Sequence, residues 1–337
     1  MTDVTQPRVW VFHGNRRGDN NQILGLAEEL GWPFETRTLY YNLWRLFGGR
    51  VVGASLMSLK RKQRQYIAPP WPDIVIATGR NSVPAARYIR RMSGGRTKLV
   101  LIGHPRVDPT DFDLLITSPS YPRPKHRNVL EQPLVFSRIK PEMAPDDEEQ
   151  AWLDALPRPH LLMAIGGSTW HYRILPERMA DIAGQLAARA EAQGGTLIVA
   201  GSPRTDPKVL PAITARLAGT RHVLTPTVAF PRFPVLINDA AEIFPTADSL
   251  SMMSEAVLTG KPSGIVPVTI KATGRESIAN AVNPKRKHRL RDLSRVWRAL
   301  TDAGLIGTVE QPVAGQAEDP LIPAAAAVRK LLDDRAG

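Results

Sequence analysis

Short apolar runs recur along the chain, and each is followed by a loop of small or polar residues and then by a helical pattern. The runs are residues 8–13, 34–39, 73–77, 98–103 and 113–118, and then 160–165, 196–200, 221–224, 241–244 and 263–266. Strands that alternate with helices in this way form parallel sheets with helices on both faces. The pattern therefore predicts a doubly wound α/β fold in each half of the chain.

A stretch rich in proline, with an acidic run, separates the two sets of strands. Residues 141–158 have the composition of a linker that contains a short helix. A chain of 337 residues is long enough for two hydrophobic cores. We therefore expect domains at 1–140 and 159–305, followed by a tail and a terminal helix at 306–337. A second basic stretch, 283–297, has apolar residues at helical spacing.

The composition excludes several classes of protein. The chain has no cysteine, which excludes disulfides and thiolate metal sites, and it shows no set of zinc ligands. No apolar run approaches the roughly 20 residues that a membrane-spanning helix needs, so we expect a soluble or peripheral protein. The net charge of +12 favours anionic partners such as phosphorylated substrates or anionic lipid. Charge alone would also permit nucleic-acid binding, but no RNA-binding motif is visible and we expect no nucleic-acid partner.

One stretch in the second half, residues 246–262, carries the strongest functional signal. Asp248 or Ser249 can cap a helix that Gly260 ends. A helix that opens directly after a strand presents free N–H groups and positive dipole charge, which suit a phosphate. Glu255 lies about two turns into this helix, where it could bind a vicinal diol such as a ribose. The alternative is an ordinary crossover with a solvated glutamate.

Two other strand ends in the second half are also compatible with phosphate binding. The turn at 166–169 contains two glycines, which let a backbone approach an anion closely. The loop at 201–205 contains hydroxyl groups and Arg204, whose guanidinium could bind a diphosphate. Neither loop matches a complete nucleotide-binding fingerprint.

Three polar residues in the first half follow different strands. They are Asp19, Arg80 and His104, and the carboxyl ends of parallel strands would bring them to the ligand-binding edge of the sheet. The structural alternatives are a helix cap for Asp19, a surface charge for Arg80 and a turn residue for His104.

Residues 40–72 contain no acidic side chain. Aromatic and aliphatic residues there interleave with cations, which is typical of a segment that lies in a membrane interface. The residues that we expect to contact a membrane, within 40–66, are Trp44, Phe47, Lys60, Arg61, Lys62 and Arg64. The alternative is a core helix followed by a basic, solvated turn.

The order and spacing of several motifs resemble those of a known family. The motifs are Gly18-Asp19-Asn20-x-Gln22, Gly79-Arg80, Ser93-Gly94-Gly95-Arg96, Pro105-Arg106-Val107, Phe112-Asp113, Ile165-Gly166-Gly167, Ser202-x-Arg204-Thr205 and Asp248-Ser249-x-Ser251-Met252-x-x-Glu255-Ala256-x-x-x-Gly260-Lys261-Pro262. The last of them looks like the nucleotide-binding motif of GT-B glycosyltransferases. The whole set resembles bacterial members of the mitochondrial-fission Elm family, which are predicted to be glycosyltransferases. The resemblance implies a GT-B-like fold, with two Rossmann-like, doubly wound parallel-sheet domains that face a central cleft.

The resemblance also implies residue roles. It places a nucleotide-sugar donor in the second half, against Gly166, Gly167, Ser168, Ser202, Arg204, Thr205, Asp248, Ser249, Ser251, Met252 and Glu255. It places the acceptor in the first half, near Gly18, Asn20, Gln22, Arg80 and His104. Several inverting GT-B enzymes carry a general base, often histidine, at the end of the first glycine loop, and Asp19 occupies the matching position. Aspartate is a weak base at neutral pH unless its surroundings raise its pKa, so His13 and His104 are the alternatives.

We therefore expect an inverting, metal-independent glycosyltransferase that needs no cofactor besides its nucleotide-sugar substrate. Its acceptor would be a lipid-linked or cell-envelope glycan, and the protein would be cytoplasmic and peripherally bound to the inner face of the cytoplasmic membrane. Two alternatives stay open. One is a sugar-nucleotide epimerase of the same fold, and the other is a non-catalytic membrane adaptor on a GT-B scaffold.

Overall fold

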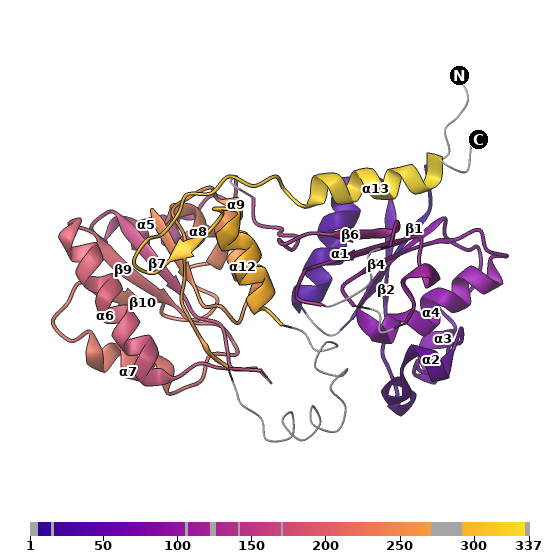
Figure 1. Ribbon diagram of the computed structural model, residues 1–337, viewed down its shortest axis with the longest axis horizontal. Helices are drawn as coiled ribbons and strands as arrows, with labels where there is room; N and C mark the ends of the chain where they lie inside the picture. The colour runs from indigo at the N-terminus through magenta and orange to yellow at the C-terminus, as the bar shows by residue number, and fades with distance from the viewer. Residues whose placement is uncertain are drawn as a thin grey trace. The chain divides into compact units, whose positions relative to one another are not determined.

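The computed structural model describes residues 6–14, 17–104, 107–121, 126–140, 142–169, 171–270 and 292–333. The chain divides into two compact units (Figure 1). Unit 1 comprises Met1–Arg138 and Asp319–Gly337, and unit 2 comprises Ile139–Glu318. The segment that we expected as a single tail, 306–337, is thus divided between the two units.

Unit 1 is built on a six-stranded parallel sheet with the order β2-β1-β3-β4-β5-β6. Its strands are β1 (Val9–His13), β2 (Phe34–Thr38), β3 (Ile74–Thr78), β4 (Lys98–Ile102), β5 (Leu114–Thr117) and β6 (Val129–Glu131). The strand order reverses between β1 and β3. In open α/β sheets, ligands bind outside the carboxyl ends of the strands at such a reversal.

Alternate residues of the unit 1 strands enter two separate cores. Along β1, Val9 and Val11 pack with α1 and α13, whereas Trp10 and Phe12 pack with α4 on the opposite face. This is the two-residue periodicity of a strand that is buried on both sides. The helical segments of unit 1 are α1 (Arg17–Leu30), η1 (Leu43–Phe47), α2 (Gly48–Val52), α3 (Arg61–Arg64), α4 (Gly79–Met92), η2 (Pro109–Asp111) and α13 (Leu321–Asp333).

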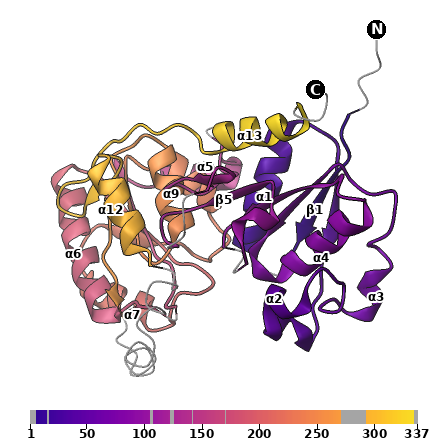
Figure 2. The same ribbon diagram turned by 45° about the vertical axis from the view of Figure 1, so that its right-hand side comes forward.

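The helix α13 belongs to unit 1 although it lies at the far end of the sequence. Figures 1 and 2 show it beside α1. The guanidinium of Arg329 donates to the carbonyl of Glu29 at 2.8 Å, and the amide of Gln132 donates to the carbonyl of Pro320 at 3.0 Å. The alanine-rich face of this helix completes the core on the α1 side of the sheet.

Unit 2 is built on a four-stranded parallel sheet with the order β10-β9-β7-β11. Its strands are β7 (His160–Ala164), β9 (Thr196–Ala200), β10 (His222–Leu224) and β11 (Glu242–Pro245). Its helices are α5 (Asp147–Asp154), α6 (Pro176–Ala192), α7 (Val209–Arg216), α8 (Phe233–Asp239), α9 (Leu250–Leu258) and α12 (Ser294–Asp302). Here the chain order reverses between β7 and β11, so this is the expected ligand position of unit 2.

Two small sheets complete unit 2. They pair β12 (Gly264–Ile265) in parallel with β14 (Gly307–Thr308), and β8 (Tyr172–Arg173) antiparallel with β13 (Thr269–Ile270). In the expected strand at 263–266, Gly264 and Ile265 form β12, whereas Ser263 and Val266 form isolated parallel bridges with Ile243 and Thr246.

The observed elements confirm the predicted α/β class with doubly wound parallel sheets, but several predicted boundaries were wrong. We expected the first helix to begin at Asn20 or Asn21, but α1 begins at Arg17, so Asp19 lies inside its first turn and is not its cap. The elements β6, α7 and α8 were not predicted. Most of the basic stretch 283–297 lies outside the described residues, and α12 accounts for its end. No helix in the described part of the chain is long and apolar enough to cross a membrane.

An ion pair attaches the linker helix α5 to unit 2. Asp146 and Glu149 form a capping box at the start of α5. The carboxylate of Glu149 is 1% exposed and accepts from the backbone N–H of Arg232 at 2.7 Å and from its guanidinium. Hydrogen bonding from Arg232 lowers the pKa of Glu149 to about 2.

We expect Glu149→Gln to lower the free energy of unfolding by about 2 kcal/mol at pH 7, because a buried charge-assisted contact is lost. A lowered carboxyl pKa stabilises the folded state above the unfolded-state value, and this contribution disappears as the pH falls from about 4.5 towards 2. Urea unfolding at several pH values should therefore show that the free energy of unfolding of the wild type falls over this pH range, and that the variant lacks this fall.

Glu35→Gln is the matched control, because Glu35 pairs with Arg37 with half of its side chain exposed. We expect this change to cost under about 1 kcal/mol. Equal stability of Glu149→Gln and wild type would show that the ion pair does not hold α5.

Candidate functional site

Three loops meet at the carboxyl edge of the unit 2 sheet, after the neighbouring strands β9, β7 and β11. The backbone N–H of Gly166 donates to Oγ1 of Thr246 at 2.8 Å, and that of Gly167 donates to Oδ2 of Asp248 at 3.0 Å. The hydroxyl of Thr246 in turn donates to Oδ1 of Asp248 at 2.7 Å. The loops after β7 and β11 are therefore joined at the reversal of strand order.

The loop after β9 joins the same network through Thr205. Its hydroxyl donates to the carbonyl of Gly166 at 2.8 Å and accepts from the backbone N–H of Ser202, also at 2.8 Å. All three loops of unit 2 that we predicted to be compatible with phosphate binding are thus brought together.

Asp248 is the buried centre of the network. Its side chain is 0% exposed, and Arg204 lies 3.9 Å from its Oδ2. Burial raises the pKa of the Asp248 carboxyl, and hydrogen bonds from Thr246 and Gly167 oppose this effect. The guanidinium of Arg204 is held over the network but remains 56% exposed, so it can contact an anion that arrives from solvent.

The two glycines are required by contacts within the protein. A Cβ on Gly166 would lie 2.4 Å from Oδ2 of Asp248, and one on Gly167 would lie 2.2 Å from the carbonyl oxygen of Arg204. Because both glycine amides already donate to side chains, the structure gives them a scaffold role where we expected them to donate to a phosphate.

The predicted phosphate contacts from hydroxyl groups also serve the scaffold. Oγ of Ser168 accepts from the backbone N–H of Ile174 at 3.1 Å, and Oγ of Ser202 accepts from that of Arg204 at 3.3 Å. Thr205 bonds to the loop after β7, as described above. Of the residues in these two loops, Arg204 is the one with a charged, solvent-facing donor.

The first turn of α9 supplies backbone donors. Ser249 is the N-cap, and its Oγ accepts from the N–H of Met252 at 3.4 Å. The N–H groups of Leu250 and Ser251 donate to no other described residue. Together with the positive end of the helix dipole, they form a candidate binding site for an anion.

Glu255 lies farther along α9 and is half-buried. No described residue donates a hydrogen bond to its carboxyl group, and burial raises its pKa to about 8. A carboxyl group without a protein partner destabilises the fold and is ready to bind hydroxyl groups of a ligand. Met252, on the same helix, packs against the hydrophobic core instead.

The predicted acceptor-side residues lie along one edge of unit 1. Asp19 is in the first turn of α1 after β1, Arg80 is in the first turn of α4 after β3, and His104 follows β4. These three strands are neighbours, and the strand order reverses between β1 and β3. His104 stacks on Tyr121, with 5.0 Å between ring centroids.

The other predicted residues on this edge differ in their roles. Asn20 is buried, and its amide group both accepts from the N–H of Gly14 at 2.8 Å and donates to its carbonyl at 2.7 Å. Asn20 therefore closes the loop after β1. Gln22 donates to the carbonyl of Gly18 at 3.5 Å, within the same helix.

Our expectation of metal-independent chemistry was supported by the absence of an Asp-x-Asp metal motif, and that observation was wrong, because Asp111-Phe112-Asp113 has this sequence. Asp113 precedes β5 at the amino edge of the sheet, where it contacts Arg90 and accepts from the N–H of Leu99 at 2.7 Å. Asp111 lies 3.6 Å from Arg87. Both acids are thus used in ion pairs, away from the carboxyl edge. Among the described residues, no group of three or more histidine, cysteine, aspartate and glutamate side chains could hold a metal.

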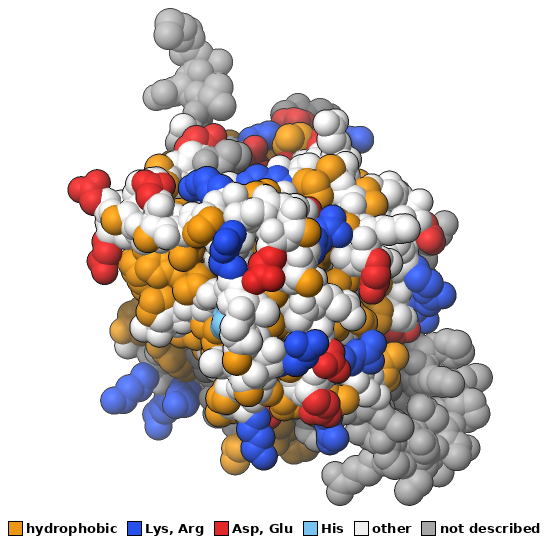
Figure 3. Space-filling model, turned by 90° about the vertical axis from the view of Figure 1, so that its left-hand side faces the viewer, with side chains coloured by type: hydrophobic (Ala, Val, Ile, Leu, Met, Phe, Trp, Pro, Cys, Tyr) orange, Lys and Arg blue, Asp and Glu red, His pale blue; other side chains and the backbone are white. Residues whose placement is uncertain are grey.

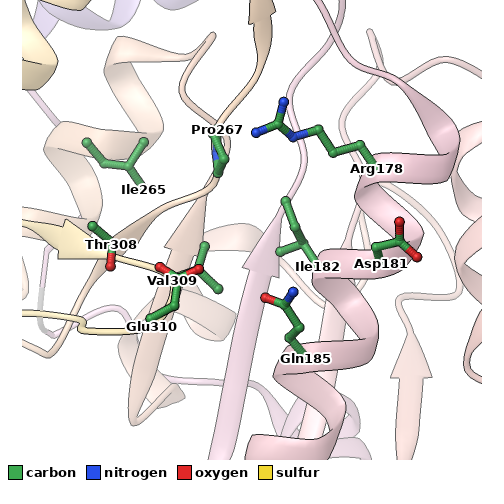
Figure 4. Close-up of a pocket in the computed structure, with 9 residues that line it drawn as sticks. All are labelled: Arg178, Asp181, Ile182, Gln185, Ile265, Pro267, Thr308, Val309 and Glu310. Carbon is green, nitrogen blue, oxygen red and sulfur yellow. The ribbon is translucent and has the colours of Figure 1, made fainter.

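A cavity of about 420 Å³ lies elsewhere in unit 2, between α6 and the chain around β12 and β14. Its lining residues are Arg178, Asp181, Ile182, Gln185, Ile265, Pro267, Thr308, Val309 and Glu310, and Figure 4 shows Arg178 reaching from α6 towards Pro267. None of the predicted site residues lines it.

Thr246 lies in the predicted stretch 246–262, but its role as a link was not predicted: it is fully buried and joins Gly166 to Asp248. The N–H group of Leu250 is one of those predicted to be available at the start of this helix. The contribution of α12 to this edge was not predicted. Trp297 on α12 donates to the carbonyl of Ala247 at 2.9 Å, a contact between segments 50 residues apart.

Comparison with solved structures shows the fold of the chain. A UDP-GlcNAc 2-epimerase from Methanocaldococcus jannaschii matches with a TM-score of 0.54 at 11% identity, over 98% of this chain and 100% of that one. A UDP-glucosyltransferase from Polygonum tinctorium matches with a TM-score of 0.52 at 13% identity, over 98% of each chain. The fold is therefore GT-B-like, as glycosyltransferases and epimerases share it.

Comparison of sequences shows the family. The mitochondrial fission protein ELM1 of Arabidopsis thaliana is 31% identical over 255 residues, which cover 65% of this chain and 58% of the plant protein. The chain thus spans less than two thirds of that relative. The family model described as "Mitochondrial fission ELM1" matches residues 17–333. The chain therefore belongs to the mitochondrial fission ELM1 family.

Proposed function

We propose that the protein is an inverting, metal-independent glycosyltransferase that uses a nucleotide sugar as donor. The loop network at the carboxyl edge of unit 2 carries this proposal. On or beside α9, at the reversal of strand order, lie an exposed guanidinium, two available helix amides and a carboxyl group that has no partner among the described residues. These groups match a diphosphate and a ribose diol.

The donor residues have separate roles in this proposal. Arg204 and the amides of Leu250 and Ser251 bind the diphosphate, and Glu255 accepts hydrogen bonds from the ribose. Asp248 does not touch the ligand, because its carboxylate is buried and holds the loops together. The names of the two enzymes of similar fold, a UDP-GlcNAc 2-epimerase and a UDP-glucosyltransferase, refer to nucleotide sugars and agree with this proposal.

The transfer step needs a base and a stabilised leaving group. An acceptor hydroxyl loses its proton to the carboxylate of Asp19 as its oxygen attacks the anomeric carbon. The bond from that carbon to the diphosphate oxygen breaks, and a nucleoside diphosphate leaves. The guanidinium of Arg204 and the amides of Leu250 and Ser251 stabilise the negative charge that develops on the leaving diphosphate. The acceptor is a lipid-linked or cell-envelope glycan, presented at the inner face of the cytoplasmic membrane.

A second candidate is a non-catalytic membrane adaptor. The family description, which refers to mitochondrial fission, and the exposed apolar surface of residues 40–66 favour it. The two candidates differ in nucleotide binding, which the adaptor does not need.

Arg204→Gln should weaken binding of a nucleoside diphosphate by roughly tenfold to a hundredfold, because a charge-assisted contact to phosphate contributes about 1.5–3 kcal/mol. Isothermal titration calorimetry measures this change. Arg216→Gln is the matched control, since Arg216 is 55% exposed and lies 3.8 Å from Asp181 in the same unit. Equal effects of the two substitutions would remove Arg204 from the site.

Glu255→Gln should raise the melting temperature above pH 7 and weaken nucleotide-sugar binding. A carboxyl pKa raised to about 8 in the folded state lowers stability as the pH rises from about 4.5 to 8, and glutamine removes this loss. Because ribose hydroxyls bind the ionised form, wild-type affinity should rise about tenfold between pH 7 and 9. The variant should show no such rise. Unchanged affinity in the variant at pH 9 would mean that Glu255 does not contact the ligand.

Asp19→Asn should reduce transfer by at least about a hundredfold while leaving donor affinity unchanged, because it removes a general base from unit 1 only. Product formation and calorimetry on the same preparation separate the two effects. His104→Gln tests the alternative base. Near-normal turnover in Asp19→Asn with a large loss in His104→Gln would move the role to His104.

A further inference from the structure

Residues 40–66 of unit 1 carry a surface that donor binding does not use. Eight large apolar side chains there are between 43% and 76% exposed: Tyr40, Leu43, Trp44, Leu46, Phe47, Val51, Met57 and Tyr66. We call these residues, with the cations Lys60, Arg61, Lys62 and Arg64, the apolar–basic surface. Single exposed apolar residues are common, but a group of this size on one segment of the chain marks an interaction site.

The segment that bears this surface is a closed loop with a fixed base. Tyr41 and Leu59 form an antiparallel bridge where the loop leaves and rejoins the unit. The amide of Asn42 donates to the carbonyls of Met57 and Leu59 at 2.8 and 3.0 Å, and its oxygen accepts from the N–H of Trp44 at 2.9 Å. The exposed side chains therefore stand on an ordered support.

The inner side of the loop packs tightly on the unit. A Cβ on Gly49 would lie 3.2 Å from Val83 on α4 and 3.3 Å from Val107, and Val52 and Leu59 are buried. On the outer side, Trp44 and Phe47 contact each other, with ring centroids 5.4 Å apart. Figure 2 shows α2 and α3 at the lower end of unit 1.

The charges of this surface have one sign. Lys60, Arg61, Lys62 and Arg64 are exposed, and no acidic residue occurs between positions 40 and 72. Part of the Arg64 guanidinium donates to the carbonyls of Met57 and Leu59, which fixes α3 to the loop. By contrast, the face of unit 2 in front in Figure 3 carries acidic and basic side chains interspersed.

We propose that the apolar–basic surface binds anionic lipid bilayers. The side chains of η1 and α2 enter the acyl boundary, and the cations of α3 lie at the headgroups. Both parts of the surface favour this binding, because large apolar side chains are stabilised by leaving water and cations are attracted to anionic headgroups. A second copy of the chain is a poorer occupant, because face-to-face packing of this surface would bring like charges together.

The location of this surface narrows the class of acceptor, an inference that rests on the proposed function. Gly49 lies so close to Val83 and Val107 that an added Cβ would be 3.2 and 3.3 Å from them. Val83 lies three residues after Arg80 on α4, and Val107 lies three residues after His104. The bilayer would therefore lie next to the predicted acceptor edge of unit 1. This favours an acceptor whose sugar is attached to a lipid anchor in that bilayer.

Vesicle flotation with purified full-length protein and no nucleotide tests the proposal. We expect binding to phosphatidylcholine vesicles that contain phosphatidylglycerol, weak binding to phosphatidylcholine alone, and loss of most binding between about 0.1 and 0.5 M salt. Two variants should each reduce the bound fraction at least about tenfold: Leu43→Ser with Phe47→Ser, and Lys60→Gln with Arg61→Gln and Lys62→Gln.

The control variant changes three exposed cations of unit 2, Arg178→Gln with Lys208→Gln and Arg216→Gln, and should bind as wild type does. If the control variant lost as much vesicle binding as the surface variants, net charge alone would explain the binding and the proposal would be overturned. Unchanged flotation of both surface variants would also overturn it. It would also be overturned if the variants abolished a dimer and wild type did not float. Nucleotide affinity in solution should be the same in all variants. Its measurement therefore distinguishes a failure of the proposed donor binding from a failure of the proposed membrane binding.

Discussion

The buried carboxylate of Asp248 is the interaction on which the unit 2 site depends. It accepts from Gly167 and Thr246 and lies 3.9 Å from the exposed Arg204. Through these partners it joins the ends of three neighbouring strands and holds a cation at their rim. Burial raises the pKa of this carboxyl, so its hydrogen bonds and the nearby guanidinium are what offset the unfavourable environment.

The groups that hold these loops together are different from the groups that are available to a ligand. The loop glycines and hydroxyl groups that resemble phosphate ligands in the sequence are used to join the loops, and the available donors lie in the first turn of α9 and at Arg204. Glu255 is the opposite case, because it has no described partner and a raised pKa. A residue that lowers stability without a structural contact is more readily explained by function than by folding.

The fold was largely predictable because it follows from local patterns. Short apolar runs followed by helical patterns predict the parallel sheets. The proline-rich, acidic composition of residues 141–158 indicated the linker. The return of α13 to unit 1 was not predictable, since it rests on contacts such as that between Arg329 and Glu29, 300 positions apart. For the site, residue types showed which loops converge, but not which polar groups are already bonded. We expected Asn20 to start the first helix, because the hydrogen bonds between its side-chain amide and the backbone of Gly14 cannot be seen in the sequence.

The most direct test of this account is an amide hydrogen-exchange map with and without nucleoside diphosphates, using a panel of UDP, GDP, CDP and ADP. Amides that already donate to buried side chains exchange slowly in either state, whereas available helix-start amides are protected only when a ligand accepts from them. The account predicts that one nucleotide slows exchange at Leu250 and Ser251, with little change at Gly166 and Gly167. Protection confined to the cavity beside α6, or none with any nucleotide, would contradict it.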